Sequence, residues 1–429
     1  MKLACIADDF TGATDVANNL VRAGMRVVQT IGVPTDDTPV DADAVVVALK
    51  SRTSPLAEAV AESLAACLWL RSQAPASDPP QIYFKYCSTF DSTAEGNIGP
   101  VTEALMDALD APFTIATPAF PDNGRAVFKG HLFVGDVLLS DSSMRHHPLT
   151  PMTDSNLVRV MQAQCKRRVG LVEHRVVAAG PEAIKARFAE LQEEGISIAI
   201  VDAIDNEALH TLGAATAGLP LVTAGSGLAI GLPSQWGFAP NAQADQLPAA
   251  TGKQAIVAGS CSAATQRQIR NYKDAGGAAL ALDPLKIAQG DDVVAETLLW
   301  AEATLNQGKP VLVYSTADAE SVKAVQAKLG TQHAGEMIER TLAAIARGLL
   351  GLGVRQLIVA GGETSGACVQ ALEIQRMQIG PQIDPGVPWC HATSPVIAGD
   401  GLHLTLKSGN FGAEDFLTKA FKVLGAAPA

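Results

Sequence analysis

The stretch LACIADDFTGATDVANNLVRAG runs from Leu3 to Gly24 and contains a strand-like segment followed at once by a helix-like one. Its first five residues, Leu3–Ala7, are apolar throughout, as in a strand that is buried on both faces. The segment Gly12–Ala23 carries apolar residues at helical spacing, and Gly24 stands where helices often end. This order of elements predicts the repeating unit of a parallel α/β sheet.

The same alternation continues along the chain and predicts an α/β protein. The further runs that we expect to be strands are Arg26–Ile31, Ala44–Leu49, Gln81–Tyr86, Phe113–Thr117, Ile196–Val201, Leu219–Thr223, Gln254–Ala258, Pro310–Tyr314, Gln356–Ala360 and Leu402–Leu406. Residues 237–252 are small and polar with no clear period, which is typical of a linker. We therefore expect two domains, 1–240 and 253–429, joined by a linker at 241–252. Each would hold a mainly parallel sheet flanked by helices.

Composition and charge exclude several classes of protein. The chain has 429 residues, of which 48% are hydrophobic, too many for a disordered protein. Its formal net charge is −12, so we expect neither nucleic acid nor an anionic membrane as a partner. Seven scattered cysteines without a CxxC pair fit a cytoplasmic protein and argue against a disulfide framework or a structural zinc site.

Polar residues follow the predicted strands of the first domain, at the end where open parallel sheets bind ligands. They are Asp8, Asp9 and Asp15 after the first strand, Arg52 after the third, Lys85, Tyr86, Cys87 and Ser88 around the end of the fourth, and Arg125 after the fifth. The cations suit a carboxylate, and the carboxylates and hydroxyls suit sugar-type hydroxyls. The pattern predicts a site for a small polyhydroxylated acid. Ordinary polar loops, in which Asp8 or Thr11 caps a helix, stay open as the alternative.

Glycine-rich turns follow three predicted strands of the second domain. They are AGS at 258–260, AGGETSG at 360–366 and LKSGNFG at 406–412. Glycine lets backbone N–H groups approach phosphate oxygens, and a helix N-terminus favours an anion. The three turns predict a site for nucleotide phosphates. Within AGGETSG we expect Gly362 to need either a positive φ or the close approach of a phosphate.

Neither common nucleotide-binding fingerprint is present in the sequence. GxxxxGK[ST] occurs nowhere, and the GSG at 225–227 departs from GxGxxG because Ile230 stands at the third glycine position. An NAD-dependent hydroxy-acid oxidoreductase built on this GSG turn stays open as an alternative, as does a non-catalytic acid-sugar sensor. A polyol-acid pocket on one domain and a phosphate site on the other favour phosphoryl transfer in the cleft between the two domains.

Several stretches of the sequence resemble the four-carbon acid sugar kinase family. They are ADDFTGATD at 7–15, KYCSTFDSTAEGNIGPV at 85–101, VTAGSGLA at 222–229, GGETSGA at 361–367 and LKSGNFG at 406–412. The likeness runs nearly end to end, and residues 130–164 are most similar to the branch that acts on 3-oxo-tetronates. The resemblance implies ATP-dependent phosphorylation of a four-carbon acid sugar by an N-terminal sugar-binding and a C-terminal nucleotide-binding domain.

The resemblance also implies roles for individual residues. The acid-sugar contacts would come from Asp9, Arg52, Lys85, Tyr86, Cys87 and Ser88. The ATP contacts would come from Ser260, Gly361, Gly362, Glu363, Thr364 and Gly409. We expect Arg52 and Lys85 to bind the substrate carboxylate, and Asp9 or, as the second candidate, Asp15 to accept the proton of the attacking hydroxyl. Mg²⁺ is expected on the phosphates, with Glu363 as a candidate ligand.

Overall fold

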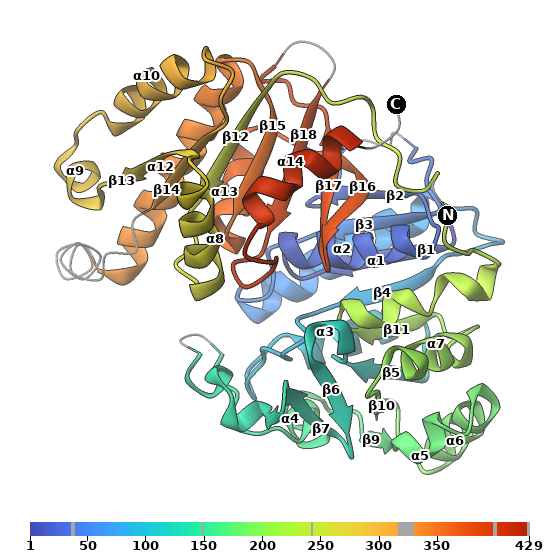
Figure 1. Ribbon diagram of the computed structural model, residues 1–429. Coiled ribbons are helices and arrows are strands. Elements are labelled where there is room, and N and C mark those ends of the chain that lie inside the picture. The colour runs from blue at the N-terminus through green and yellow to red at the C-terminus, as the bar shows by residue number, and fades with distance from the viewer. Residues whose placement is uncertain (36–38, 148–149, 242, 316–329, 398–400, 427–429) are drawn as a thin grey trace. The chain divides into compact units, whose positions relative to one another are not determined.

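Two units make up the chain, Met1–Asp245 and Gln246–Ala429. The structure, a computed structural model, describes residues 1–35, 39–147, 150–241, 243–315, 330–397 and 401–426 (Figure 1). Both units consist of a sheet with helices packed on it, which confirms the predicted α/β class. None of the helices in these ranges is long and apolar enough to span a membrane.

The sheet of the first unit contains eight parallel strands in the order β2-β3-β1-β4-β11-β5-β10-β9. The strands are β1 Leu3–Ala7, β2 Val27–Ile31, β3 Ala44–Ala48, β4 Gln81–Lys85, β5 Thr114–Thr117, β9 Val169–Val172, β10 Ile198–Val201 and β11 Leu221–Ala224. The register pairs Ala7 with both Ala48 and Lys85, so β1, β3 and β4 end side by side. The loops that follow these three strands therefore begin at one edge of the sheet.

Helices flank the sheet of the first unit (Figure 1). They are α1 Phe10–Arg22, α2 Leu56–Ser72, α3 Ile98–Ala108, α4 Leu157–Gln164, α5 His174–Val177, α6 Pro181–Glu193 and α7 Asn206–Ala215, with short 3₁₀ turns η1 Pro121–Asn123, η2 Leu139–Asp141, η3 Ser143–His146, η4 Ser226–Ile230 and η5 Pro233–Trp236. Asp9 caps α1, because its side chain accepts a hydrogen bond from the Gly12 N–H. Gly24 follows the helix with φ +100°, the left-handed conformation expected there.

A small antiparallel sheet was not predicted from the sequence. It contains β6 Arg125–Phe128, β7 His131–Val134 and β8 Val137–Leu138, most of whose residues are half-buried or exposed, unlike those of the central strands. Asp202 ties its first turn to the main sheet, because its carboxylate accepts hydrogen bonds from the Lys129 and Gly130 N–H groups, each at 2.8 Å. Arg125 begins β6, and its guanidinium donates to the Asn123 carbonyl.

The sheet of the second unit has the order β13-β14-β12-β15-β18-β17-β16. Its strands are β12 Lys253–Ala258, β13 Ala278–Leu282, β14 Val311–Ser315, β15 Val354–Ala360, β16 Arg376–Asp384, β17 Val387–Ala392 and β18 Leu402–Lys407. Its helices are α8 Ala263–Asp274, α9 Pro284–Gln289, α10 Val293–Leu305, α12 Thr331–Gly351, α13 Gly362–Ala371 and α14 Phe416–Ala426. Five neighbouring strands are parallel, whereas β16 and β17 form a hairpin that also pairs antiparallel with β18. The sheets are thus mostly parallel, as expected.

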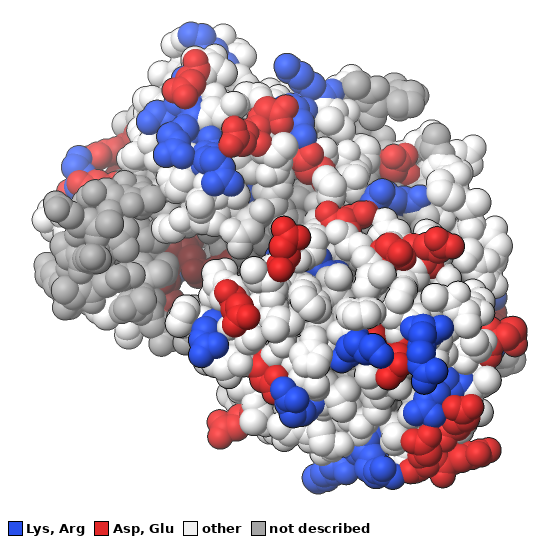
Figure 2. All heavy atoms as spheres, turned by 60° about the horizontal axis from the view of Figure 1, so that its bottom comes forward, with Lys and Arg blue, Asp and Glu red and all other residues white. Residues whose placement is uncertain are grey.

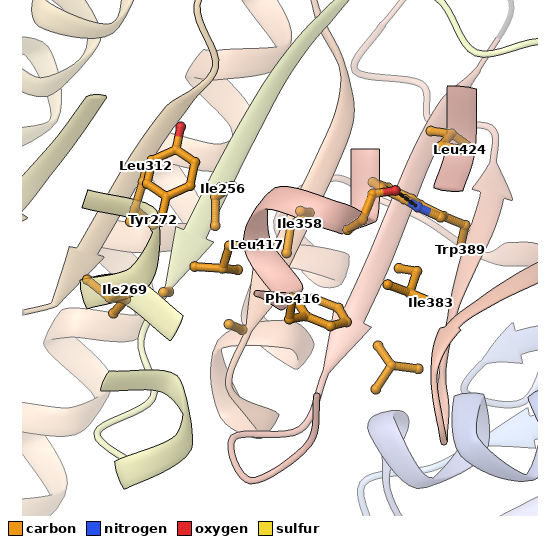
Figure 3. Close-up of a cluster of buried hydrophobic side chains, with 14 residues drawn as sticks. Ile256, Ile269, Tyr272, Leu312, Ile358, Ile383, Trp389, Phe416, Leu417 and Leu424 are labelled. Carbon is orange, nitrogen blue, oxygen red and sulfur yellow. Dashed lines mark hydrogen bonds between the residues drawn. The ribbon is translucent and has the colours of Figure 1, made fainter. Parts of the chain in front are cut away.

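A cluster of buried apolar side chains supports the second unit, shown in Figure 3. Trp389 of β17 is fully buried within it, and its indole N–H donates to the Ala420 carbonyl of α14 at 2.8 Å. Phe416 and Leu417 anchor the start of α14 in the same cluster. Burial of the indole and its one hydrogen bond therefore fix α14 on the sheet.

We expect Trp389→Ala to lower the free energy of unfolding by roughly 3–5 kcal/mol, because it leaves a large cavity. Urea unfolding followed by circular dichroism measures the loss. The matched control is Leu299→Ala on α10, where the side chain is 70% exposed and the change should stay within about 0.5 kcal/mol. Equal effects of the two substitutions would contradict the role given to Trp389.

Candidate functional site

Arg52 lies in the loop after β3 and forms a two-pronged ion pair with Asp8, which directly follows β1. Its Nε donates to Asp8 Oδ2 at 2.9 Å and its Nη2 to Asp8 Oδ1 at 2.8 Å. The Asp8 side chain is 7% exposed, and burial raises the pKa of its carboxyl although Arg52 opposes that rise. The guanidinium is therefore fixed in one orientation at the edge of the sheet.

Asp9 forms ion pairs with both cations at this edge, Arg52 and Lys85. Its Oδ1 accepts from Arg52 Nη2 at 2.6 Å and from Lys85 Nζ at 3.1 Å, while its Oδ2 accepts from the Thr11 hydroxyl and the Gly12 N–H. Burial alone would raise the pKa of Asp9, but the charges of Arg52 and Lys85 outweigh it and hold that pKa well below its usual range. Asp9 is therefore an ionised acceptor that orients two cations.

Lys85 ends β4 with a side chain that is 4% exposed. Burial by itself would lower the pKa of Lys85, but Asp9 and Asp8 raise it above its usual value. A Cβ on residue 12 would lie 1.6 Å from Lys85 Nζ and 2.1 Å from Asp9 Oδ1. Gly12 is therefore required for the approach of this lysine to the start of α1.

Asn97 holds the loop that carries Arg52, a role that the sequence analysis missed. Its Nδ2 lies within hydrogen-bond distance of the carbonyls of Ser51, Arg52 and Ser54, at 2.9, 3.3 and 3.0 Å. Asn97 directly precedes α3, where an asparagine would ordinarily be read as a helix cap, yet it makes no side-chain capping bond there. Its position inside the stretch 85–101 was the available signal.

Asp15 lies on α1 in an environment unlike that of Asp9. The Ser226 hydroxyl donates to Asp15 Oδ2, and Oδ1 is buried without a hydrogen-bond partner. Burial raises the pKa of Asp15 to about 6, although the nearby Lys85 charge opposes the rise. A carboxyl with such a pKa can exchange a proton near neutral pH.

The GSG turn after β11 has a packing role. A Cβ on Gly227 would lie 2.2 Å from the Ala119 carbonyl oxygen, and one on Gly225 would lie 2.9 Å from that of Pro118. The Tyr83 hydroxyl donates to the Gly225 carbonyl. These glycines thus accommodate the loop that follows β5, which explains their spacing without a dinucleotide.

The residues after Lys85 differ in what their side chains can reach. Tyr86 is fully buried with its hydroxyl 3.3 Å from Thr223 Oγ1, so its side chain belongs to the core. Cys87 is half-buried, its Sγ lies 2.9 Å from Thr89 Oγ1, and burial raises the pKa of its thiol to about 12. Ser88 is also half-buried. Cys87 and Ser88 are therefore the members of this segment whose side chains reach the surface.

The three glycine loops of the second unit converge. The joining contacts are Ser260 N to the Ala360 carbonyl (3.2 Å), Gly361 N to the Lys407 carbonyl (2.9 Å) and Ser262 Oγ to the Gly409 carbonyl (2.5 Å). The N-termini of α8 and α13 begin in two of these loops. The first N–H groups of a helix have no partner within the helix, so the starts of α8 and α13 in these joined loops suit phosphate oxygens.

The positive φ within AGGETSG falls on Gly361 rather than on Gly362. Gly361 has φ +129°, and a Cβ there would lie 2.9 Å from Thr364 Oγ1. Gly362 has no positive φ, and a Cβ on it would meet nothing within 4 Å. A positive φ at Gly362 is therefore excluded, because the chain turns at Gly361, between the end of β15 and the first residue of α13. The close approach of a phosphate to Gly362 stays a prediction. Open space beside Gly362 leaves room for a ligand.

The next two residues of α13 differ in exposure. Glu363 is exposed in the first turn, whereas Thr364 is buried. A Cβ on Gly259 would lie 2.1 Å from Thr364 Oγ1, so the glycine makes room for the threonine. In the described ranges, no three His, Cys, Asp or Glu side chains gather as a metal-binding group.

Charges of both signs mix over the face shown in Figure 2, where Lys and Arg residues lie among Asp and Glu residues. Among the ion pairs of the first unit, Arg187 contacts Glu190 and Glu194, and Lys129 and Arg175 both contact Glu173. All seven cysteines lie in the described ranges, and all are free.

Two family models match the chain and together cover most of it. The model described as a sugar-binding N-terminal domain matches residues 3–232, and the one described as a nucleotide-binding C-terminal domain matches residues 255–417. The first range contains the Asp9–Arg52–Lys85 cluster, and the second contains the three glycine loops.

Two relatives that align over their full length are both named 3-oxo-tetronate kinase. The chain is 54% identical to the 3-oxo-tetronate kinase of Burkholderia multivorans, covering 99% of this chain and 98% of the relative, and 54% identical to the 3-oxo-tetronate kinase of Pseudomonas savastanoi pv. phaseolicola, with the same coverage. It is also 43% identical to a Haemophilus influenzae protein of known crystal structure, with a TM-score of 0.80, covering 98% of this chain and 100% of the other. With both domain models and full-length relatives in agreement, the chain belongs to the four-carbon acid sugar kinase family.

Proposed function

We propose that this kinase transfers the γ-phosphoryl group of ATP to the C4 hydroxyl of a 3-oxo-tetronate, giving the 4-phosphate and ADP. The main support is the Asp9–Arg52–Lys85 cluster, which lies in the range that matches the sugar-binding domain model. Two cations held in fixed orientations suit a small carboxylate. The full-length relatives named 3-oxo-tetronate kinase support the choice of substrate.

The test of this function is an assay of ADP formation over a panel of D- and L-series four-carbon acid sugars, with ³¹P NMR of the product. We expect ADP and a C4 phosphate ester with a 3-oxo-tetronate. NADH formation from a hydroxy acid without ADP would instead support the oxidoreductase. Binding of the acid sugar without any ADP formation would support the sensor.

The acid sugar is proposed to bind at the carboxyl ends of β1, β3 and β4. Arg52 and Lys85 would bind its carboxylate, while Asp9 keeps both cations in place. Cys87 and Ser88 would line the same site, and Tyr86 would contribute through its backbone.

Asp15 is our proposal for the proton acceptor, ahead of Asp9. Asp9 is held ionised by two cations and is therefore a weak base, whereas burial raises the pKa of Asp15 to about 6. A base is most effective when its pKa lies near the working pH.

ATP is proposed to bind the converging loops of the second unit, through Ser260, Gly361 to Thr364 and Gly409. Mg²⁺, which commonly binds one or two carboxylates together with phosphates and water, would find the Glu363 carboxylate in the first turn of α13. When bound, it would neutralise phosphate charge.

Transfer requires the C4 hydroxyl and the γ-phosphorus to meet, so the proposed reaction takes place in the cleft between the two domains. The free cysteines support a cytoplasmic location.

Arg52→Ala should raise the KM for the acid sugar while leaving the KM for ATP within about twofold, because a charge-assisted contact of about 2–4 kcal/mol is lost. Steady-state kinetics with each substrate varied in turn measures the two constants. The control is Arg159→Ala, which removes a comparable two-pronged pair with Asp154 on the exposed surface. An unchanged acid-sugar KM in Arg52→Ala would remove the residue from the site.

Asp15→Asn should lower kcat by about 10²–10⁴-fold if this carboxyl accepts the proton. In the wild type, kcat/KM for the acid sugar should rise with pH through about 6, since the carboxyl is protonated below its pKa and ionised above it. Ser226→Ala removes a hydrogen bond that favours the ionised form, so the midpoint of the profile should move to higher pH. Near-normal kcat in Asp15→Asn would exclude the role.

Gly362→Ala and Gly361→Ala form a matched pair. Gly362→Ala adds a methyl group in open space at an ordinary φ, so we expect an unchanged melting temperature and a raised KM for ATP. Gly361→Ala forces a side chain into the left-handed region against Thr364, so we expect lower stability as well, by about 1–2 kcal/mol. Normal ATP kinetics in Gly362→Ala would mean that no phosphate approaches this residue.

A further inference from the structure

Lys407 is the last residue of β18, and it is fully buried. Its Nζ lies 3.1 Å from the Thr265 hydroxyl oxygen, and 3.0, 3.2 and 3.2 Å from the carbonyl oxygens of Ser408, Gly409 and Phe411. All four partners are neutral oxygens, and the ion pairs of the described residues include none with Lys407. The ammonium is thus coordinated by one loop and one helix.

This lysine occupies a place that packing alone would give to an apolar residue. Nζ lies 6.0 Å from the centre of the Phe416 ring, which is part of the apolar cluster in Figure 3. Burial of an ammonium without a carboxylate partner is costly, and it lowers the pKa of Lys407 to about 7. A lysine at this position therefore does not stabilise the core. Its ammonium instead serves the loop 408–411, whose carbonyls it contacts.

Lys407 determines which way the polar backbone groups of loop 408–411 point. The carbonyls of Ser408 and Gly409 turn toward Nζ, and a planar trans peptide directs the following N–H the opposite way. The N–H groups of Gly409 and Asn410 consequently point away from Lys407. Neither donates in the backbone hydrogen bonds of the described residues, and Asn410 is exposed. Two successive N–H groups that point outward are suited to donate hydrogen bonds to an anion.

Contacts with α8 connect loop 408–411 to the first glycine loop. The hydroxyls of Ser262 and Thr265 both donate to the Gly409 carbonyl, at 2.5 and 2.9 Å. A Cβ on Gly409 would lie 2.4 Å from Ser260 Oγ. The Thr265 hydroxyl thus links Lys407 and the Gly409 carbonyl, and Ser260 lies against the same turn.

We propose that Lys407 is a positioning residue for the nucleotide, which holds the carbonyls of loop 408–411 inward so that the N–H groups of Gly409 and Asn410 face a phosphate. The inference rests on the proposed ATP site of the second unit. It adds Asn410 to the contacts of that site through its backbone, and it assigns to Lys407 a role without direct contact to the ligand.

The test is Lys407→Met in the full-length protein, which keeps an unbranched side chain of similar volume and removes every N–H donor. We expect the KM for ATP and the Kd for ADP measured by calorimetry to rise about tenfold or more, as for loss of hydrogen bonds to a charged group. The KM for the acid sugar should stay within about twofold. The control is Leu424→Ala in the same core cluster, which should lower the melting temperature with both KM values unchanged.

Thr265→Val provides a second variant should Lys407→Met fail to fold. It removes one partner of Lys407 and one donor to the Gly409 carbonyl, so the same selective rise for ADP is expected, with a smaller factor. A loss of thermal stability with unchanged ATP and ADP constants, in whichever variant folds, would overturn the role of Lys407. Absence of ATP turnover and ADP binding in the wild type would instead overturn the proposed function.

Discussion

The register of three parallel strands determines the first site. Because Ala7 pairs with both Ala48 and Lys85, the chain leaves β1, β3 and β4 at one level of the sheet. The Asp8 carbonyl then accepts a hydrogen bond from the Arg52 N–H, and the Asp8 carboxylate accepts one from the Arg52 guanidinium. If either pairing shifted by one residue, the loops would start at different levels of the sheet and their charged side chains would move apart. The geometry of this candidate site thus depends on main-chain pairing in the buried centre of the unit.

Environment gives the two carboxylates of α1 different chemistry. Asp9, at the helix N-cap, is surrounded by donors, and its pKa is held low by two cations. Asp15, less than two turns later, is buried with one hydroxyl donor and has a raised pKa. Two similar side chains on one helix can therefore serve orientation and proton transfer separately.

Much of the fold could be predicted from the sequence because its central strands are buried on both faces. Such strands read as continuous apolar runs, and all those predicted in the first unit lie within one residue or two of the observed bounds. The hairpin β16–β17 was missed because its strands carry polar residues and a Gly–Pro pair at 380–381. β9 was missed because it is an edge strand that contains Gly170 and has alternate residues only half-buried. The small sheet was missed because few of its residues are buried.

The candidate site was predictable where chemistry follows from position after a strand, as for Asp9, Arg52 and Lys85. It was not predictable where a residue acts on another part of the chain. The amide of Asn97 supports a loop more than forty residues earlier, and burial of Lys407 is visible only in three dimensions. The left-handed glycine is likewise fixed by where β15 ends, a boundary that the sequence does not resolve to one residue.

The alternation of Asp8, Arg52, Asp9 and Lys85 has a consequence for how an acid sugar would be attracted. Two negative and two positive charges cancel, and the whole chain carries −12, so no long-range field draws an anion to this edge. Capture would depend on short, directed hydrogen bonds formed at contact. Raising the ionic strength would then not weaken association of the anion, unlike in proteins that steer anions with a net positive cleft.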